Sequence, residues 1–166
     1  MTHAAELMPL DYAGQTAREL LALEGKYRTD SLCRAFESAL QKKAGTAVDL
    51  TDEELVLLAV EAVEREVNNG GYRQFFVNAS HVFSLISVAS LTRIGCAETA
   101  AITKRAIEAL KVKTVTPRSV QKAIMKENPQ RDEILDACNN AYYKSGEPIA
   151  ERLFAFVKGN AGQFKF

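Results

Sequence analysis

The sequence predicts an all-α protein, a single domain built as a bundle of about eight helices. Apolar residues recur at helical spacing in one segment after another. No run alternates apolar and polar residues over the length of a strand, and residues 112–115, which come closest, are short enough for a loop. With 166 residues, of which 47% are hydrophobic and 25% charged, the chain is long enough to bury a core without disulfides or metals.

The first elements are delimited by glycine, proline and helix-capping residues. Residues 1–14, which include Pro9 and Gly14, are predicted to be an N-terminal leader ahead of a helical domain at 15–160. The first helix is predicted at about residues 15–27, and the second runs from residue 29 or 30 to Gly45. Residues 161–166 are predicted to be a loose C-terminal tail.

The clearest helix start is Thr51-Asp52-Glu53-Glu54, which has the pattern of a capping box. In this arrangement the threonine side chain accepts a hydrogen bond from a backbone N–H in the first turn, and the Glu54 side chain accepts one from the backbone N–H of the threonine. The acidic residues also suit the positive N-terminal end of the helix. This helix is predicted to end at the glycine pair at 70–71.

Six more helices are predicted beyond the glycine pair. A short helix carries Tyr72, and the apolar residues between 82 and 91 predict a mostly buried helix that ends near Gly95. Another spans about 97–110. Prolines at the first helical position mark helices that run from Pro117 to about 126 and from Pro129 to 143 or 144. The last helix is predicted to start at Glu147-Pro148. Four of its apolar residues are expected to face the core: Ile149, Leu153, Phe154 and Val157.

One segment has the character of a motif, Glu66-Val67-Asn68-Asn69-Gly70-Gly71-Tyr72-Arg73-Gln74-Phe75-Phe76-Val77-Asn78. Gly70 or Gly71 is placed to adopt positive φ and close the preceding helix. Tyr72, Phe75 and Phe76 follow at i, i+3 and i+4, which sets three aromatic rings on one side of the next helix. The motif therefore predicts a tight helical corner with an aromatic underside.

Glu66 points to the apolar side of its helix, in line with Leu55, Ala59 and Ala62. A buried carboxylate requires hydrogen-bond donors, and the nearest are the amides of the corner, including Gln74 and Asn78. One interpretation is that Glu66 is a structural clamp that holds the corner. The other is that it is a catalytic or ligand-binding carboxylate. The residues assigned to the motif and clamp are Glu66, Asn68, Asn69, Gly70, Gly71, Tyr72, Gln74, Phe75, Phe76 and Asn78.

The run Asn69-Gly70-Gly71-Tyr72-x-Gln74-Phe75-Phe76-x-Asn78, led by Glu66-Val67-Asn68, resembles the signature of a bacterial domain-of-unknown-function family that includes the DNA-mimic proteins. Tyr72 stands where the usual form has Phe. In outline the similarity covers residues 15–160. It implies an all-helical fold, a homodimer and no known enzyme activity. In the member that gives the family its name, an acidic surface imitates the phosphate backbone and occupies a transcription factor's DNA-binding face.

Charge is balanced overall, with 21 basic and 21 acidic residues, but it is unevenly distributed. Residues 49–66 hold seven acids against Arg65, and residues 104–126 hold seven bases against Glu108. These stretches are either two solvated faces that neutralise each other or two functional surfaces. A DNA mimic needs clustered carboxylates and net negative charge, so the neutral chain argues against mimicry. The basic stretch lacks interleaved aromatics and a known motif, so direct nucleic-acid binding is not expected.

The helix that begins at Asp52 also suggests a partner-binding face. Leu57 lies amid Glu53, Glu54, Glu61 and Glu64 on the helical wheel. An apolar side chain ringed by carboxylates is either packed under a neighbouring helix or the anchor of an interface with an acidic rim.

Motifs for catalysis, metals and cofactors are lacking. The two histidines, His3 and His81, stand alone, and the sequence contains no zinc-protease, nucleophile-elbow, P-loop or EF-hand pattern. Three widely spaced cysteines indicate reduced thiols and a cytoplasmic protein. No secretion signal or membrane-spanning run is expected.

The sequence therefore predicts a non-enzymatic protein-protein interaction module. It is expected to resemble the DNA-mimic proteins, to form a homodimer and to regulate a DNA-binding partner and so transcription. One alternative is an immunity- or antitoxin-like inhibitor. The other is a small enzyme that uses the polar corner at Glu66, Asn69, Gln74 and Asn78.

Overall fold

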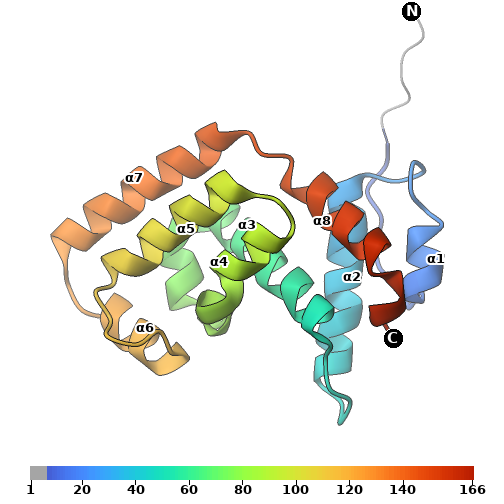
Figure 1. Ribbon diagram of the computed structural model, residues 1–166, viewed down its shortest axis with the longest axis horizontal. Helices are drawn as coiled ribbons and strands as arrows, with labels where there is room; N and C mark the ends of the chain where they lie inside the picture. Colours follow the sequence, from blue (N-terminus) through green and yellow to red (C-terminus); the bar gives the residue numbers. More distant parts are fainter. Residues whose placement is uncertain (1–6) are drawn as a thin grey trace, which may run out of the picture. The chain divides into compact units, whose positions relative to one another are not determined.

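The computed structural model describes residues 7–166. Within that range the chain forms eight α-helices and two short 3-10 helices, and it forms no strand (Figure 1). The prediction of an all-α bundle of about eight helices is confirmed. The predicted loop at residues 112–115 is also confirmed, because this stretch joins two helices without forming either helix or strand.

The chain divides into two compact units. One unit contains the residues up to Leu57 together with Ile149–Phe166, and the other is Leu58–Pro148. The predicted boundaries of the helical domain, at residues 15 and 160, stay a prediction.

The first unit is built on the packing of α2 (Thr29–Ala44) against α8 (Ile149–Gly159) (Figure 1). The helix α1 (Ala17–Leu21) lies against α2 and is much shorter than the predicted 15–27. Thr16 and Glu19 cap its start, and Gly25 has a φ of 75°, so the chain turns where the prediction continued the helix. The core of this unit includes Leu20, Leu32, Phe36, Leu40, Leu153 and Val157.

The C-terminal residues pack within the first unit, to which they belong, so the expectation that residues 161–166 are loose is wrong. The short helix η2 (Ala161–Gln163) leads into Phe164, which is buried. The rings of Phe164 and Phe166 meet Phe36 edge-on, with centroids 5.7 and 5.5 Å away. Burial of aromatic surface is the physical reason that this end of the chain is ordered.

The start of α3 (Asp52–Val77) confirms the predicted capping box. Thr51 N–H donates to Glu54 Oε2 over 2.9 Å, and Glu54 N–H donates to Thr51 Oγ1 over 3.1 Å. Glu54 is fully buried, and Lys43 donates to its carboxylate from 2.6 Å. The backbone N–H of Lys165 donates to the same carboxylate. Glu54 therefore joins α2, α3 and the C-terminal residues.

The second unit is arranged around α5 (Ala97–Ala109), which packs against both α4 (Ser84–Arg93) and α7 (Pro129–Ser145) (Figure 1). The 3-10 helix η1 (Ala79–Phe83) and α6 (Pro117–Ile124) also pack together. The predicted starts of α6 and α7 are confirmed, because Thr116 and Asn128 cap helices that have proline in the first turn.

The glycine pair interrupts α3 as the motif predicts. Gly71 has a φ of 77° and a ψ of −177°, a combination that is essentially confined to glycine. The rings of Tyr72, Phe75 and Phe76, which follow the break, are fully buried. An added Cβ at Gly71 would lie 2.4 Å from Asn139 Nδ2. Both its backbone conformation and its surroundings therefore require glycine.

The orientation of α4 differs from the prediction. Its apolar residues were expected to be buried, yet Leu85 is 65% exposed and Val82, in η1, is 49% exposed. The buried side chains are Leu91 and the serines Ser80, Ser84, Ser87 and Ser90. Small hydroxyl side chains suit a close helix contact. The buried Ser87 hydroxyl has a hydrogen-bond partner, because its Oγ donates to the Ser84 carbonyl over 3.2 Å.

No single helix in the described range is long and apolar enough to cross a membrane. One bent pair, α3 followed by residues 79–93, meets the length and composition criteria, with a bend of 75° between its halves.

Replacing Gly71 by alanine tests the glycine requirement. We expect Gly71→Ala to lower the free energy of unfolding by about 3 kcal/mol or more, because the new Cβ meets Asn139 in a strained backbone conformation. Gly146→Ala is the matched control, since Gly146 also has positive φ but open space around it. We expect it to lose only about 1–2 kcal/mol. Urea unfolding measures both, and equal midpoints would show that the Asn139 contact is unimportant.

Candidate functional site

The carboxylate of Glu66 accepts hydrogen bonds from three side chains that follow the glycine pair in sequence. Gln74 Nε2 and Asn78 Nδ2 donate to Oε2 over 2.9 and 2.8 Å. Ser80 Oγ donates to Oε1 over 2.9 Å. Arg65 lies near the same oxygen, with its Nε 3.5 Å away. The carboxylate thus ties the helix before the break to the segment after it.

These contacts set the protonation state of Glu66. Burial acts to raise its pKa, but the hydrogen bonds from Gln74, Asn78 and Ser80 and the positive charge of Arg65 outweigh burial. The pKa is therefore lowered from its ordinary value of 4.5. At neutral pH the side chain is an ionised hydrogen-bond acceptor, and this is the state that a structural clamp requires.

The opposite side of the corner is fixed by contacts with α5 and α7. Tyr72 N–H donates to Asn139 Oδ1 over 2.8 Å, and the Tyr72 hydroxyl lies 2.8 Å from Thr103 Oγ1. Burial raises the pKa of Tyr72, which therefore keeps its proton for this contact. The Tyr143 hydroxyl donates to the Val67 carbonyl over 2.6 Å. The corner is thereby held from two neighbouring helices.

The remaining motif residues have different surroundings. Asn68 Nδ2 donates to the Glu64 carbonyl and, over 3.3 Å, to the Tyr142 hydroxyl. At Gly70 an added Cβ would lie 2.1 Å from Gln74 Oε1, so this glycine leaves room for a clamp residue. Asn69 is exposed. The structure brings Glu66, Gln74 and Asn78 together, and within residues 7–166 the side chain of Asn69 forms no hydrogen bond with them.

The predicted acidic partner-binding face is wrong. Leu57 and Glu54 are fully buried, and Glu61 is also buried, whereas Glu53 and Glu64 are only partly exposed. The prediction assumed that one side of α3 faces solvent. Neighbouring elements instead cover this stretch of the helix, and the buried carboxylate of Glu54 is neutralised by Lys43.

Histidine and cysteine side chains add little chemistry to the described part of the chain. A ring nitrogen of His81, in η1, lies 2.7 Å from the Asn78 carbonyl, and His3 lies outside the described residues. Cys33, Cys96 and Cys138 are all buried thiols, and burial raises the pKa of Cys138. Among residues 7–166, no group of three or more metal-ligating side chains has the geometry to hold a metal ion.

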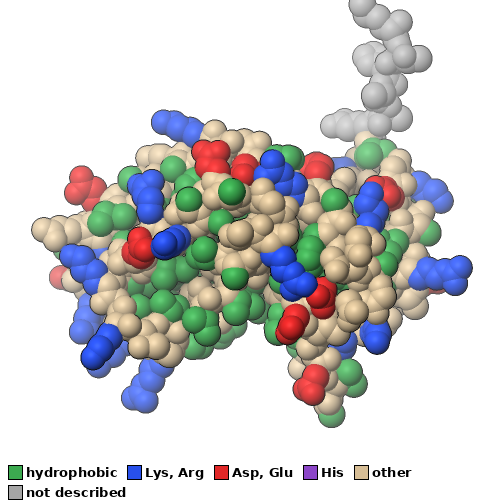
Figure 2. All heavy atoms as spheres, viewed as in Figure 1, with side chains coloured by type: hydrophobic (Ala, Val, Ile, Leu, Met, Phe, Trp, Pro, Cys, Tyr) green, Lys and Arg blue, Asp and Glu red, His purple; other side chains and the backbone are tan. Residues whose placement is uncertain are grey.

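The surface that the sequence interpretation missed is the apolar side of η1 and α4. Figure 2 shows hydrophobic side chains gathered over the position that α4 has in Figure 1. Val82 and Leu85 are the most exposed of them, and Val77 at the end of α3 is also exposed. The spacing of the serines at 84, 87 and 90 indicates this orientation in the sequence, since it marks a narrow polar side on an otherwise apolar helix.

The Glu66 clamp predicts a pH-dependent contribution to stability. We expect Glu66→Gln to lower the free energy of unfolding by about 1–3 kcal/mol at pH 7, because the amide removes one acceptor and turns an N–H₂ group toward other donors. Since the pKa of Glu66 is lowered in the folded state, its contribution is present above about pH 4.5 and is lost as the pH falls through the folded pKa. The difference in unfolding free energy between Glu66→Gln and the wild type should therefore become smaller below pH 4.5.

Chemical denaturation at a series of pH values measures this difference. Glu133→Gln, at an exposed position of α7, is the matched control and should change stability by less than about 0.5 kcal/mol. A Glu66→Gln variant as stable as wild type at pH 7 would contradict the clamp.

Comparison with known proteins gives one match. A family model described as "DMP19-like protein" matches residues 48–160, which is more than half of the chain and includes the whole motif. No curated protein and no solved structure matches the chain. The resemblance drawn from the motif is confirmed: the chain belongs to the DMP19-like protein family, a DNA-mimic-like family.

Proposed function

We propose that the protein is a non-enzymatic protein-protein interaction module that works as a homodimer. The observation that carries this proposal is the exposed apolar side of η1 and α4, which holds Val82, Leu85 and Ala89 while the serines point inward. A helix that buries its hydroxyl groups and exposes its aliphatic side chains loses hydrophobic stabilisation within one chain. Contact with a second protein surface restores that stabilisation.

The composition of this surface favours a second copy of the chain. The stretch from Gln74 to Thr92 contains no Asp, Glu, Lys or Arg. In a two-fold symmetric dimer each residue near the axis meets its own copy or a close neighbour, so a charged surface would repel itself. An uncharged aliphatic surface pairs with itself without that penalty.

Membership of the DMP19-like family supports a DNA-binding regulator as the class of protein that the dimer controls. The distribution of acids argues that contact is not made by imitating DNA. Of the seven acids at 49–66, Glu54, Glu61 and Glu66 are buried. A phosphate-like array needs carboxylates directed at solvent, where they attract a basic partner.

The enzyme alternative has less support from the polar corner. The three donors around Glu66 occupy its two oxygens, and its lowered pKa leaves it ionised. A general acid or base that works near neutral pH instead needs a raised pKa and a free side toward a substrate. The immunity- or antitoxin-like alternative shares the protein-binding surface and differs in the partner.

The dimer is tested by placing a charge on the apolar surface. We expect sedimentation equilibrium of the wild type to give twice the 18.3 kDa mass of the chain. Leu85→Glu should weaken the dimer by at least about a hundredfold, because symmetry places the buried charge there twice. Its far-ultraviolet circular dichroism should not change, since Leu85 is exposed in the single chain.

Met125→Glu is the matched control for this experiment. Met125 is 71% exposed in the turn after α6, so the same charge is introduced at another apolar surface position. We expect Met125→Glu to remain dimeric. A monomeric wild type, or equal dissociation by the two variants, would refute the dimer proposed here.

The class of partner is tested separately by affinity capture from the native host and mass spectrometry. We expect capture of a DNA-binding regulator. In a DNA mobility-shift assay, the fraction of DNA bound by that regulator should change when the protein is added. Capture of a toxin whose activity the protein abolishes would instead establish the inhibitor alternative.

A further inference from the structure

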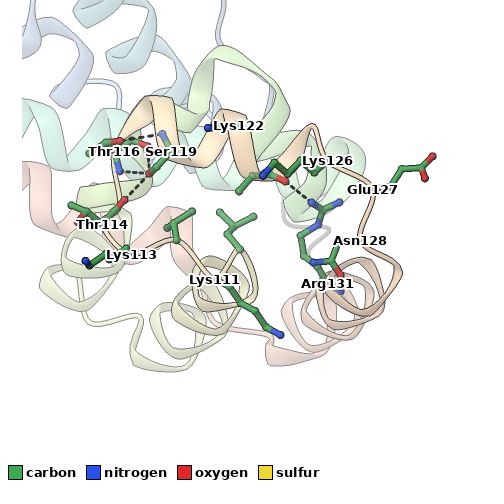
Figure 3. A pocket seen from close by; sticks show the side chains of 13 residues that line it. Lys111, Lys113, Thr114, Thr116, Ser119, Lys122, Lys126, Glu127, Asn128 and Arg131 are labelled. Carbon is green, nitrogen blue, oxygen red and sulfur yellow. Dashed lines mark hydrogen bonds between the residues drawn. The ribbon is translucent and has the colours of Figure 1, made fainter.

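A groove of about 490 Å³ lies in the second unit, between the loop after α5, the helix α6 and the start of α7 (Figure 3). Leu110, Val112 and Ala123 provide aliphatic surface within it, and four lysines line it: Lys111, Lys113, Lys122 and Lys126. All four lysines are exposed, and none forms an ion pair within the described residues 7–166. Glu127 is the single acid of the lining, and in Figure 3 it points away from the groove.

Internal hydrogen bonds connect the elements that frame this groove. Arg131 is 3% exposed, and its Nη1 donates to the Ala123 carbonyl over 2.7 Å, which ties α7 to α6. Its Nε and Nη2 are bound by Asp132. At the other end Ser119 Oγ donates to the Thr114 carbonyl over 2.6 Å and so fixes the loop onto α6. The groove is thus held open by internal contacts that leave the lysines available.

From these features we infer that the groove binds an acidic protein segment that carries an aliphatic side chain. The lysines supply positive charge along the groove without neutralising partners, so carboxylates are attracted to it. The aliphatic surface of Leu110, Val112 and Ala123 accepts an apolar anchor between those charges. This site is separate from the apolar surface of α4 and does not depend on the dimer.

Two other anionic ligands fit the groove less well. Lys111 and Lys113 point in different directions in Figure 3, so the amines do not converge on one small anion such as phosphate. No aromatic side chain is among the residues that line the groove within the described chain, so nucleic-acid bases have no surface on which to stack. An extended acidic segment uses both the separated charges and the aliphatic surface.

The inference is tested by fluorescence anisotropy on the full chain, with a labelled peptide of glutamates around a central leucine. We expect saturable binding that weakens as salt increases. The double substitution Lys122→Glu and Lys126→Glu should weaken binding at least about tenfold, because it reverses charge on one wall of the groove. Replacing the peptide leucine by serine should also weaken binding, by about threefold or more, through loss of the apolar contact.

The matched control is the double substitution Lys26→Glu and Lys144→Glu, which makes the same change in net charge at exposed positions that do not line the groove. It should change affinity by less than about twofold. Circular dichroism of both double variants checks that the fold is intact. An equal loss in the control, no effect of the leucine replacement, or tighter binding of a DNA duplex of the same charge would each overturn the inference. A monomeric wild type would refute the proposed homodimer but would not contradict peptide binding in the groove.

Discussion

The hydrogen bonding of the Glu66 carboxylate is the interaction on which the second unit depends. A buried carboxylate is stable only when donors surround it, and Gln74, Asn78 and Ser80 supply them from beyond the break at Gly70 and Gly71. A second bend, of 75°, follows between α3 and residues 79–93, and the bond from Ser80 to Glu66 spans it. Gly71 makes the break within α3 possible for the backbone, and the bonds from Gln74, Asn78 and Ser80 to Glu66 hold the chain in the conformation that follows it.

The same interaction accounts for the orientation of α4. Ser80 is held by Glu66 at the start of η1, which fixes the side of this segment that faces inward. Positions 84, 87 and 91 continue that side at helical spacing, and they are buried. The aliphatic residues between them are consequently directed outward. The polar clamp and the exposed apolar surface of α4 are therefore two results of one hydrogen-bonded carboxylate.

Local signals predicted the helix starts and the corner, because each depends on a few neighbouring residues. Thr51, Thr116 and Pro129 mark helix starts that the structure confirms, and the Gly-Gly pair marks the break. Burial was predicted less well, since it depends on what covers a helix. From hydrophobicity alone, the apolar side of α4 was predicted to be buried and the acids around Leu57 were predicted to be exposed. Both expectations failed because contacts distant in sequence, such as Lys43 with Glu54, decide which side is covered.

Burial also changes how the zero net charge should be interpreted. Among residues 7–166, four carboxylates, those of Glu37, Glu54, Glu61 and Glu66, are buried, against the two cations of Lys43 and Arg131. Buried charges are compensated nearby and act little at a distance, whereas exposed charges set the field that an approaching partner meets. The exposed surface is therefore more basic than the sequence total indicates, and the lysines of α6 concentrate that charge beside the groove. In this member of a DNA-mimic-like family, three of the six acids of α3 are buried, and two of them, Glu54 and Glu66, bind donors within the fold, so that helix presents little of the acidic field that mimicry needs.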